Sequence, residues 1–339
     1  MQIGVLLPFS TSGSEAQSLY DAAELAMFDH GDETTLLLPR DSGRDPASAS
    51  AAAQKLLGDG ADIIIGPISK DQVGAISAST RGARVPVVGF STDATVAGNG
   101  VYLLAYPFEE EVYRIVDYAN AQGIKNFAIL APDTEYGRRV DAAFRAEVAR
   151  HGDQVVAGII YPRTDKDAGA AAQSMAAQAK AAGAQAVLIA DNGSPLRMIA
   201  QTFLQASFDT KRIKLLGTGL WAADAQREPS LAGGWYAAPD PALRAAFEAR
   251  YRAAYNRAPS RLASLAYDAV AVSETLAHGQ GSALTPQAFQ RSDGFLGADG
   301  VFRFKTDGTV QRGLAVVEVH PGAPTIVDPA PTALTNRGS

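Results

Sequence analysis

Short apolar runs alternate along the chain with longer stretches in which apolar residues recur every three or four positions. The runs Ile63–Ile65 and Val85–Val88 are too short for helices, and they predict strands that are buried on both faces of a parallel sheet. Between them, Val73 and Ile76 have the spacing of one short amphipathic helix. The same alternation starts with a strand at Ile3–Leu7, so this part of the chain predicts a doubly wound α/β sheet with right-handed crossovers.

A second series with the same order of elements follows Tyr106-Pro107. Strands are predicted at Phe127–Leu130 and Ala186–Ala190, with an alanine-rich helix around residues 168–182 between them. A chain of 339 residues is also long for one domain. We therefore expect two similar α/β lobes.

The last third of the chain breaks this rhythm. Two consecutive helices are predicted at Pro241–Ala254 and Ser260–His278. A closing hairpin is predicted to pair Val301–Phe304 with Leu314–Val319 across a turn at Asp307-Gly308. The remaining tail is rich in Pro, Ala and Thr and is expected to be loosely held.

Composition narrows the functional classes. Hydrophobic residues make up 47% of the chain and charged residues 19%, which suits large buried cores. The net charge is -6 and the basic residues form no run, so nucleic acid is not expected as a partner. No apolar run approaches the length that spans a membrane. The absence of cysteine excludes disulfides, thiol catalysis and cysteine metal sites.

The chain contains no convincing catalytic set. His30, His151 and His278 each end a predicted helix before glycine, where a cation suits the negative helix terminus, and His320 lies in the tail. There is no G-x-S-x-G or S-x-x-K motif, no phosphate loop and no glycine fingerprint after the first strand. Asp165-Lys166-Asp167 falls short of a calcium loop. We therefore predict a protein that is not an enzyme and uses no cofactor and no metal.

Polar and aromatic residues gather where the predicted strands end. Ligands of parallel sheets bind beyond the carboxyl ends of the strands, where loops and helix N-termini present free backbone N–H groups. The first lobe offers Ser10, Thr11, Ser69, Lys70, Ser91, Thr92 and Asp93 at these positions. The second lobe offers Asp133, Tyr136, Asp191, Asn192, Ser194 and Trp221.

Two interpretations of these residues are open. The serines and threonines could equally cap the helices that follow, and Tyr136 and Trp221 could equally be packing residues. Loops that arrive side by side in both lobes favour a shared small-molecule cleft in a hinge-closing binder.

Several segments resemble the type I periplasmic binding proteins, in particular the leucine/isoleucine/valine-binding group. The segments are IGVLLPFSTSG, DGADIIIGPISK, VPVVGFSTDAT, ILAPDTEYGRRV and LASLAYDAV, and the likeness extends to about Val319. The resemblance implies two Rossmann-like lobes that are joined by three hinge strands and enclose a ligand cleft. The implied divisions are 1–106 plus 239–297 for the N-terminal lobe, 107–238 plus 298–320 for the C-terminal lobe, and 321–339 for a loosely ordered tail. The implied hinge crossings are Tyr106-Pro107, Ala237–Pro239 and Gly297–Val301.

The same resemblance implies which residues bind the ligand. They are Ser10, Ser69, Lys70, Ser91, Thr92, Asp93, Tyr136, Asn192, Ser194, Trp221 and Tyr267. In the amino-acid-binding members, the loops that match Ser69-Lys70 and Ser91–Asp93 hold the ligand's carboxylate and ammonium. Here Lys70 and Asp93 replace the usual hydroxyl residues, and Gly219 stands where an acidic residue is usual. These departures argue against an ordinary branched-chain amino acid as the ligand.

The function implied by the resemblance is capture of a small polar solute, amino-acid-like or related, for an ABC-type transporter. The segments GFSTDATVAGNGVYLLAYP and LLGTGLWAADA also resemble lipoprotein activators of penicillin-binding proteins, which share the fold. The alternative is therefore a scaffold that contacts a peptidoglycan synthase. The expected partners are a small-molecule ligand and either a transporter permease or that synthase. Both functions place the chain in the periplasm, with an export signal or lipoprotein leader removed ahead of Met1.

Overall fold

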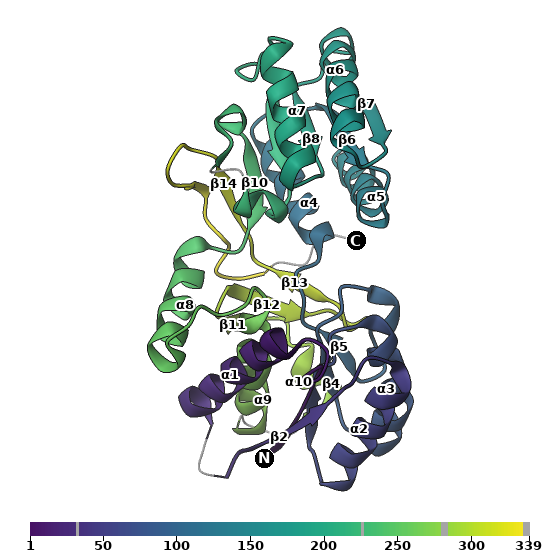
Figure 1. Ribbon diagram of the computed structural model, residues 1–339, viewed down its shortest axis with the longest axis vertical. Helices are drawn as coiled ribbons and strands as arrows, with labels where there is room; N and C mark the ends of the chain where they lie inside the picture. The colour runs from purple at the N-terminus through teal and green to yellow at the C-terminus, as the bar shows by residue number, and fades with distance from the viewer. Residues whose placement is uncertain (32–33, 225–226, 279–283, 335–339) are drawn as a thin grey trace. The chain divides into compact units, whose positions relative to one another are not determined.

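The computed structural model describes residues 1–31, 34–224, 227–278 and 284–334, and these form two compact α/β units (Figure 1). Unit 1 comprises Met1–Tyr106, Pro241–Gly313 and the segment from Pro331, and unit 2 comprises Pro107–Asp240 and Leu314–Ala330. The prediction of two lobes with parallel sheets is confirmed. Among the described helices, none combines the length and the apolar character needed to cross a membrane.

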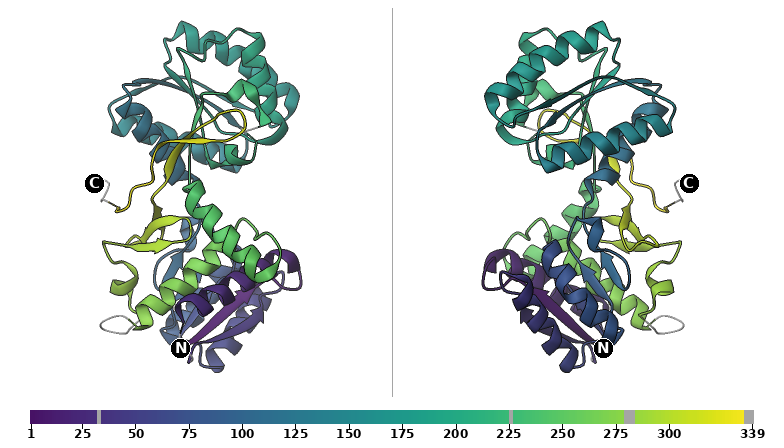
Figure 2. Two further views of the ribbon diagram at one scale, coloured as in Figure 1. Left: turned by 90° about the vertical axis from the view of Figure 1, so that its left-hand side faces the viewer. Right: turned by 90° about the vertical axis from the view of Figure 1, so that its right-hand side faces the viewer.

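Unit 1 is built on a parallel sheet of five strands in the order β2-β1-β3-β4-β5. The strands are β1 (Gln2–Leu7), β2 (Leu36–Asp41), β3 (Ile63–Ile65), β4 (Val87–Gly89) and β5 (Val101–Leu103). Alternate residues of β1 face opposite layers, as the pleat of a strand requires. Val5 packs in a core with α1 (Gly13–His30) and α9 (Ala263–His278), whereas Leu6 packs in a core with α2 (Pro46–Gly58) and α3 (Lys70–Ala83). These two pairs of helices lie on opposite sides of the sheet (Figures 1 and 2).

The later part of unit 1 adds helices and a small antiparallel sheet. The elements are α8 (Pro241–Tyr255), α10 (Pro286–Phe289), β11 (Phe295–Gly297), β12 (Gly300–Phe304) and β13 (Val310–Arg312). The predicted pairing of Val301–Phe304 with Leu314–Val319 is wrong, because β12 pairs with β13 and β14 (Ala315–Glu318) pairs with β10 (Trp235–Ala238) in unit 2.

Two contacts explain where this hairpin lies. The backbone N–H of Leu103 in β5 donates a hydrogen bond to the carbonyl of Gly308 in the hairpin turn, at 2.8 Å. The ring of Phe304 is buried and lies 5.3 Å from the ring of Tyr102. Residues 298–313 therefore belong to unit 1, although the resemblance implied the second lobe. The third passage of the chain between the units accordingly follows Gly313 and not Gly297–Val301.

Unit 2 contains a sheet of seven strands in the order β15-β14-β10-β9-β8-β6-β7. Its remaining strands are β6 (Asn126–Pro132), β7 (Gln154–Tyr161), β8 (Ala186–Ile189), β9 (Lys214–Gly217) and β15 (Thr325–Asp328). Strands β6 to β10 are parallel, and β14 and β15 are antiparallel to their neighbours. One face packs on α4 (Phe108–Ala121) and α5 (Glu135–Arg150), and the other on α6 (Asp165–Ala181) and α7 (Gly193–Gln205).

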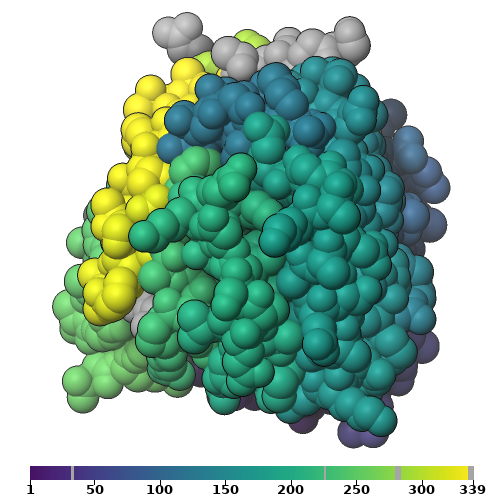
Figure 3. Space-filling model, turned by 90° about the horizontal axis from the view of Figure 1, so that it is seen from above, coloured from purple at the N-terminus to yellow at the C-terminus, as the bar shows by residue number. Residues whose placement is uncertain are grey.

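The tail is more ordered than its composition predicts. Strand β15 pairs with β14, and the Asp328 carboxylate accepts a hydrogen bond from Arg114 at 2.6 Å. In Figure 3 the yellow C-terminal residues run along one side of this unit, opposite the teal residues of its other edge. The expectation of a loose tail is thus wrong for Thr325–Asp328, and residues 335–339 lie outside the described part of the chain.

Candidate functional site

Two neighbouring loops in unit 1 carry most of the residues predicted there. They follow β3 and β4, which are adjacent in the sheet, so both open at its carboxyl edge. Ser69 is the N-cap of α3, and its hydroxyl accepts a hydrogen bond from the Gln72 backbone N–H at 3.4 Å. Ser91 is buried, and its hydroxyl accepts from the Asp93 N–H at 3.1 Å. Ser69 therefore caps α3 at this edge, whereas Ser91 holds the loop at Asp93, which is the N-cap of the short helix Ala94–Val96.

Lys70 and Asp93 form an ion pair across the two loops. Lys70 Nζ lies 3.1 Å from Asp93 Oδ2, with Lys70 half exposed in the first turn of α3. Hydrogen bonds from the Thr95 hydroxyl and backbone N–H, and then the Lys70 ammonium, lower the pKa of Asp93 to about 2. Thr92 is exposed between Ser91 and Asp93. The ammonium of Lys70 thus offsets the carboxylate that would otherwise repel an anionic ligand.

Ser10 lies at the same edge, in the loop after β1. Its backbone N–H donates a hydrogen bond to Asp41 Oδ1 at 3.2 Å. Partial burial opposes ionisation of Asp41, but hydrogen bonds from Ser10 and from the Gly43 backbone outweigh it and lower the pKa of this carboxyl. Asp41 ends β2, and it was not among the predicted residues.

Tyr267 lies elsewhere. Its hydroxyl donates a hydrogen bond to Asp29 at 2.9 Å and lies 3.0 Å from His30 Nε2. Asp29 and His30 end α1, which leaves β1 at the carboxyl edge and runs back along the sheet to the amino edge. The structure therefore does not bring Tyr267 together with the other unit 1 residues.

In unit 2, Tyr136 joins a cluster that the sequence pattern did not reveal. Its hydroxyl is 2.8 Å from the Thr218 hydroxyl, and its ring meets Phe108 edge-on with 5.1 Å between the centroids. The first turn of α4 also brings in Glu111, a buried residue whose Oε2 accepts the Gly219 N–H at 2.8 Å. A Cβ at position 219 would lie only 2.6 Å from Glu111 Oε1. Glycine at 219 thus makes room for a carboxylate that another helix supplies.

Asn192 and Ser194 lie at the start of α7, beyond β8. The Asn192 side chain accepts a hydrogen bond from Arg163 Nη2 at 2.7 Å, and the Ser194 hydroxyl donates to Asp165 at 2.6 Å. Buried Asp191 accepts from Arg163 Nε at 3.0 Å and from the Tyr161 hydroxyl. Burial, and then the hydrogen bond to Asp191, raise the pKa of Tyr161.

Trp221 is a packing residue. Its side chain is fully buried in a core of unit 2, and its indole N–H donates to the Ile189 carbonyl at 3.2 Å. A Cβ on Gly217 would lie 2.2 Å from the indole ring, so the ring covers the end of β9 closely. Of the two interpretations that the sequence left open for this residue, the structure supports packing.

Three polar residues at the carboxyl edge of the unit 2 sheet were not predicted from the sequence. They are Glu111, Thr218 and Arg163, and none of them is among the predicted site residues. A local signal existed only for Thr218, which directly follows β9, and for Arg163, which lies two residues beyond the end of β7. Glu111 could not be found in this way, because its partner Gly219 is 108 residues away in the chain.

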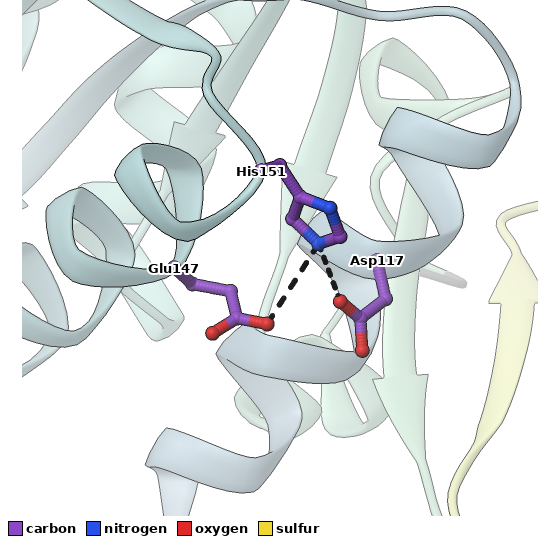
Figure 4. A group of neighbouring side chains, drawn as sticks. All are labelled: Asp117, Glu147 and His151. Atoms are coloured by element: carbon purple, nitrogen blue, oxygen red, sulfur yellow. Dashed lines mark hydrogen bonds and ion pairs between the residues drawn. The ribbon is translucent and has the colours of Figure 1, made fainter. Parts of the chain in front are cut away.

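One side-chain group in unit 2 contains metal-ligand types. Asp117, Glu147 and His151 have ligand atoms that all lie within 4.8 Å of one another (Figure 4). His151 Nε2 is 2.6 Å from Asp117 Oδ1. The Arg150 guanidinium enters the same group, with Nη2 2.7 Å from Asp117 and 2.5 Å from Glu147. This cation already supplies the positive charge, so the group is best described as an ion-pair network that joins α4 to α5.

A surface hollow of about 960 Å³ lies at the other end of unit 2. It is lined by residues of α6, of the α6–β8 loop and of the segment between α7 and β9, including Lys180, Phe208 and Arg212. These segments precede β8 and β9, so the hollow opens at the amino edge of the sheet. None of the predicted site residues lines it.

The chain was compared with known proteins. Residues 1–324 match the family model of periplasmic binding proteins. Over 162 residues the chain is 29% identical to the penicillin-binding protein activator LpoA of Vibrio vulnificus (strain YJ016). That match covers 45% of this chain and 26% of the relative, so the chain spans about a quarter of the relative's length.

Solved structures with the same fold cover nearly the whole chain. A branched chain amino acid ABC transporter periplasmic ligand-binding protein from Burkholderia xenovorans LB400 has a TM-score of 0.75 at 21% identity, covering 99% of this chain and 94% of its own. An ABC transporter substrate-binding protein from Sphaerobacter thermophilus has a TM-score of 0.73 at 19% identity, with 98% of each chain covered. A solute-binding protein of R. palustris in complex with 4-hydroxybenzoate has a TM-score of 0.66 at 18% identity, with 98% of each chain covered. At these identities the likeness shows the shared fold alone.

Proposed function

The chain belongs to the periplasmic binding protein family, and from that premise we propose that it captures a small polar solute between its two units for delivery to an ABC-type transporter. The observation that carries the proposal is the pair of adjacent loops after β3 and β4. They place Ser69, Lys70 and Ser91 beside the N-terminus of α3, at the edge where parallel sheets bind ligands.

The charges at this edge favour a solute that bears a carboxylate. The N-terminus of α3 carries a partial positive charge, and the Lys70 ammonium balances the Asp93 carboxylate that would otherwise repel such a solute. Asp93 is held by Thr95 and Lys70, so its negative charge is already matched by donors. In unit 2 the Tyr136 and Thr218 hydroxyls and the Glu111 carboxylate offer polar groups to the rest of the solute. The names of the structural neighbours support testing amino acids and aromatic acids first.

Thermal unfolding in the presence of candidate solutes tests the proposal. The panel contains leucine, other amino acids, benzoate, 4-hydroxybenzoate, nucleosides and cell-wall fragments. A solute at one hundred times its Kd adds about 2.7 kcal/mol to the free energy of unfolding, which raises the Tm by several degrees. Lys70→Met should reduce the shift that an anionic solute causes. Lys55→Met is the matched control, because Lys55 is exposed in the last turn of α2 at the amino edge. A flat response to the whole panel would refute the proposal.

The second candidate function is that of a lipoprotein that activates a peptidoglycan synthase. The observation in its favour is the 29% identity to the penicillin-binding protein activator from Vibrio vulnificus. Glycosyltransferase assays of a purified synthase, with and without this protein, test it. Under this function Thr92→Ala and Tyr136→Phe should leave activation intact, whereas under the first function they should weaken solute binding. Both functions require export, so we also propose a periplasmic location that is reached through a leader ahead of Met1.

A further inference from the structure

The chain passes between the units after Tyr106, Asp240, Gly313 and Ala330, and the first three of these passages begin or end at one polar cluster in unit 1. Tyr106 is the last residue of unit 1 before the first passage, and Arg244 lies in the first turn of α8, where the chain returns at Pro241. Arg312 is the second-last residue before the third passage after Gly313. We call these three residues, with Asp268 and Asp299, the crossing cluster.

Tyr106 is at the centre of the crossing cluster. Its hydroxyl donates a hydrogen bond to the Asp299 carboxylate and lies 2.7 Å from the Ser264 hydroxyl on α9. Arg244 Nη1 donates to the same tyrosine oxygen at 3.2 Å and lies 3.3 Å from Asp299 Oδ1. One tyrosine hydroxyl thus links the segment that leaves unit 1 to the segment that returns.

Arg312 adds the third segment. Its Nε donates to the Ala105 carbonyl at 2.6 Å, and its guanidinium lies 4.6 Å from the centroid of the Tyr106 ring. Asp268 on α9 accepts the Ala298 backbone N–H at 2.6 Å, next to Asp299 in the chain. Residues from all three segments therefore contact one another directly or through Asp299 and the Tyr106 ring.

The crossing cluster is poorly suited to a purely stabilising role. Asp268 and Asp299 are 1% and 2% exposed and Arg312 is 6% exposed, so these ionisable groups have lost most of their hydration. Asp268 Oδ2 and Arg312 Nη2 are buried and have no hydrogen-bond partner among the described residues. Buried ion pairs of this kind often contribute less stability than apolar residues would, and they are better at fixing one arrangement.

We propose that the crossing cluster positions the three passage segments, so that it restricts the relative orientations open to the two units and thereby sets solute affinity. Its residues act through the segments and need not touch the solute. The consequence for affinity rests on the proposed solute-binding function, whereas the effect on orientation does not. The control is the ion pair between Arg250 and Asp29, which also lies in unit 1 but joins α8 to α1 outside the crossing cluster.

Distance measurement between two spin labels tests the proposal without a solute. The chain has no cysteine, so Gln54→Cys on α2 and Ala170→Cys on α6 give one exposed label in each unit. Electron-electron resonance would compare this double-cysteine protein with the same protein carrying Tyr106→Phe, Asp299→Asn or the control Arg250→Gln. We expect Tyr106→Phe and Asp299→Asn to raise the population of minor distances about tenfold, equivalent to about 1.4 kcal/mol, and Arg250→Gln to leave the distribution unchanged.

Two outcomes would overturn the proposal: an unchanged distribution in Tyr106→Phe, or equal broadening in Arg250→Gln. Should Asp299→Asn fail to fold, Tyr106→Phe decides alone, because it removes one hydroxyl and keeps every charge. Arg312→Met should also broaden the distribution, and Arg312→Lys should partly restore it, which a simple loss of packing would not produce. If no panel solute binds, the distance result still stands, so failure of the proposed function remains distinguishable from failure of this inference.

Discussion

Asp268→Asn should change how the stability of unit 1 depends on pH. Asp268 lies on α9 and is 1% exposed. Burial, and then the nearby Asp299 carboxylate, raise its pKa to about 7, although Arg312, the Ala298 N–H and Arg244 act in the opposite direction. In the unfolded chain the same carboxyl titrates near its ordinary value of 3.8. Between these two values the folded state holds a proton that the unfolded state has released.

The sign and size of the effect follow from this difference. Stability from Asp268 is fully present below about pH 4 and is lost as the pH rises to about 7, because ionisation in the buried site is unfavourable. Each pH unit in this window costs up to about 1.4 kcal/mol, so the whole window is worth about 4 kcal/mol at most. Asparagine is neutral throughout and keeps an oxygen that can accept the Ala298 N–H.

Urea unfolding at about pH 4, 5, 6, 7 and 8 measures this pH dependence, and hydrogen exchange of the α9 amides at the same pH values assigns it to unit 1. We expect the wild-type free energy of unfolding to fall across the window and the Asp268→Asn protein to show a much smaller slope. Asp59→Asn is a suitable control, since Asp59 is an exposed carboxylate that pairs with Arg40 at the surface. A slope in Asp268→Asn equal to that of the wild type would refute the reasoning.

Three further predictions concern Lys70 in unit 1 and Trp221 and Gly219 in unit 2. Lys70→Met should raise the pKa of Asp93 from about 2 while leaving it below the ordinary value, because the Thr95 donors remain. A carboxyl NMR titration measures this pKa, and an unchanged value would contradict the ion pair. Trp221→Ala should cost unit 2 about 3–5 kcal/mol in denaturant unfolding, whereas a loss below about 1 kcal/mol would show that the ring is not core. Gly219→Ala should destabilise unit 2 by about 1–3 kcal/mol in denaturant unfolding, because the new methyl displaces Glu111 from its hydrogen bond. The control Gly58→Ala should be neutral or slightly stabilising, because a Cβ there meets no atom within 4 Å.

Local patterns in the sequence predicted most of the fold. Runs such as Ile63–Ile65 are apolar on both faces and became central strands, and the turn residues after them set the carboxyl edge. The hairpin was mispredicted because the strand that pairs with β12, Val310–Arg312, has one apolar residue, whereas the more apolar segment 314–319 follows the same glycine turn. The contacts that hold this hairpin on β5, Phe304 with Tyr102 and Gly308 with Leu103, join segments about two hundred residues apart in the chain, which no local pattern records.

The candidate site was predicted less completely. Residues that follow a strand directly, such as Ser69 and Ser91, could be placed from the order of elements alone. The pairing of Glu111 with Gly219 and the contact of Tyr267 with Asp29 depend on packing between distant segments, which no local pattern records. Trp221 illustrates the same limit, because an aromatic residue after a strand suits a binding cleft and a core equally well.

The central claim is that a small solute is captured by closure of the two units. The most direct test is the label distance between Gln54→Cys and Ala170→Cys, measured while each solute of the panel is added. The account predicts that at least one carboxylate-bearing solute converts the distribution to a single narrow population that differs from the solute-free one, and that Lys70→Met requires more of it. A distribution that stays the same at saturating concentrations of every solute would contradict the account and favour the synthase-activating alternative.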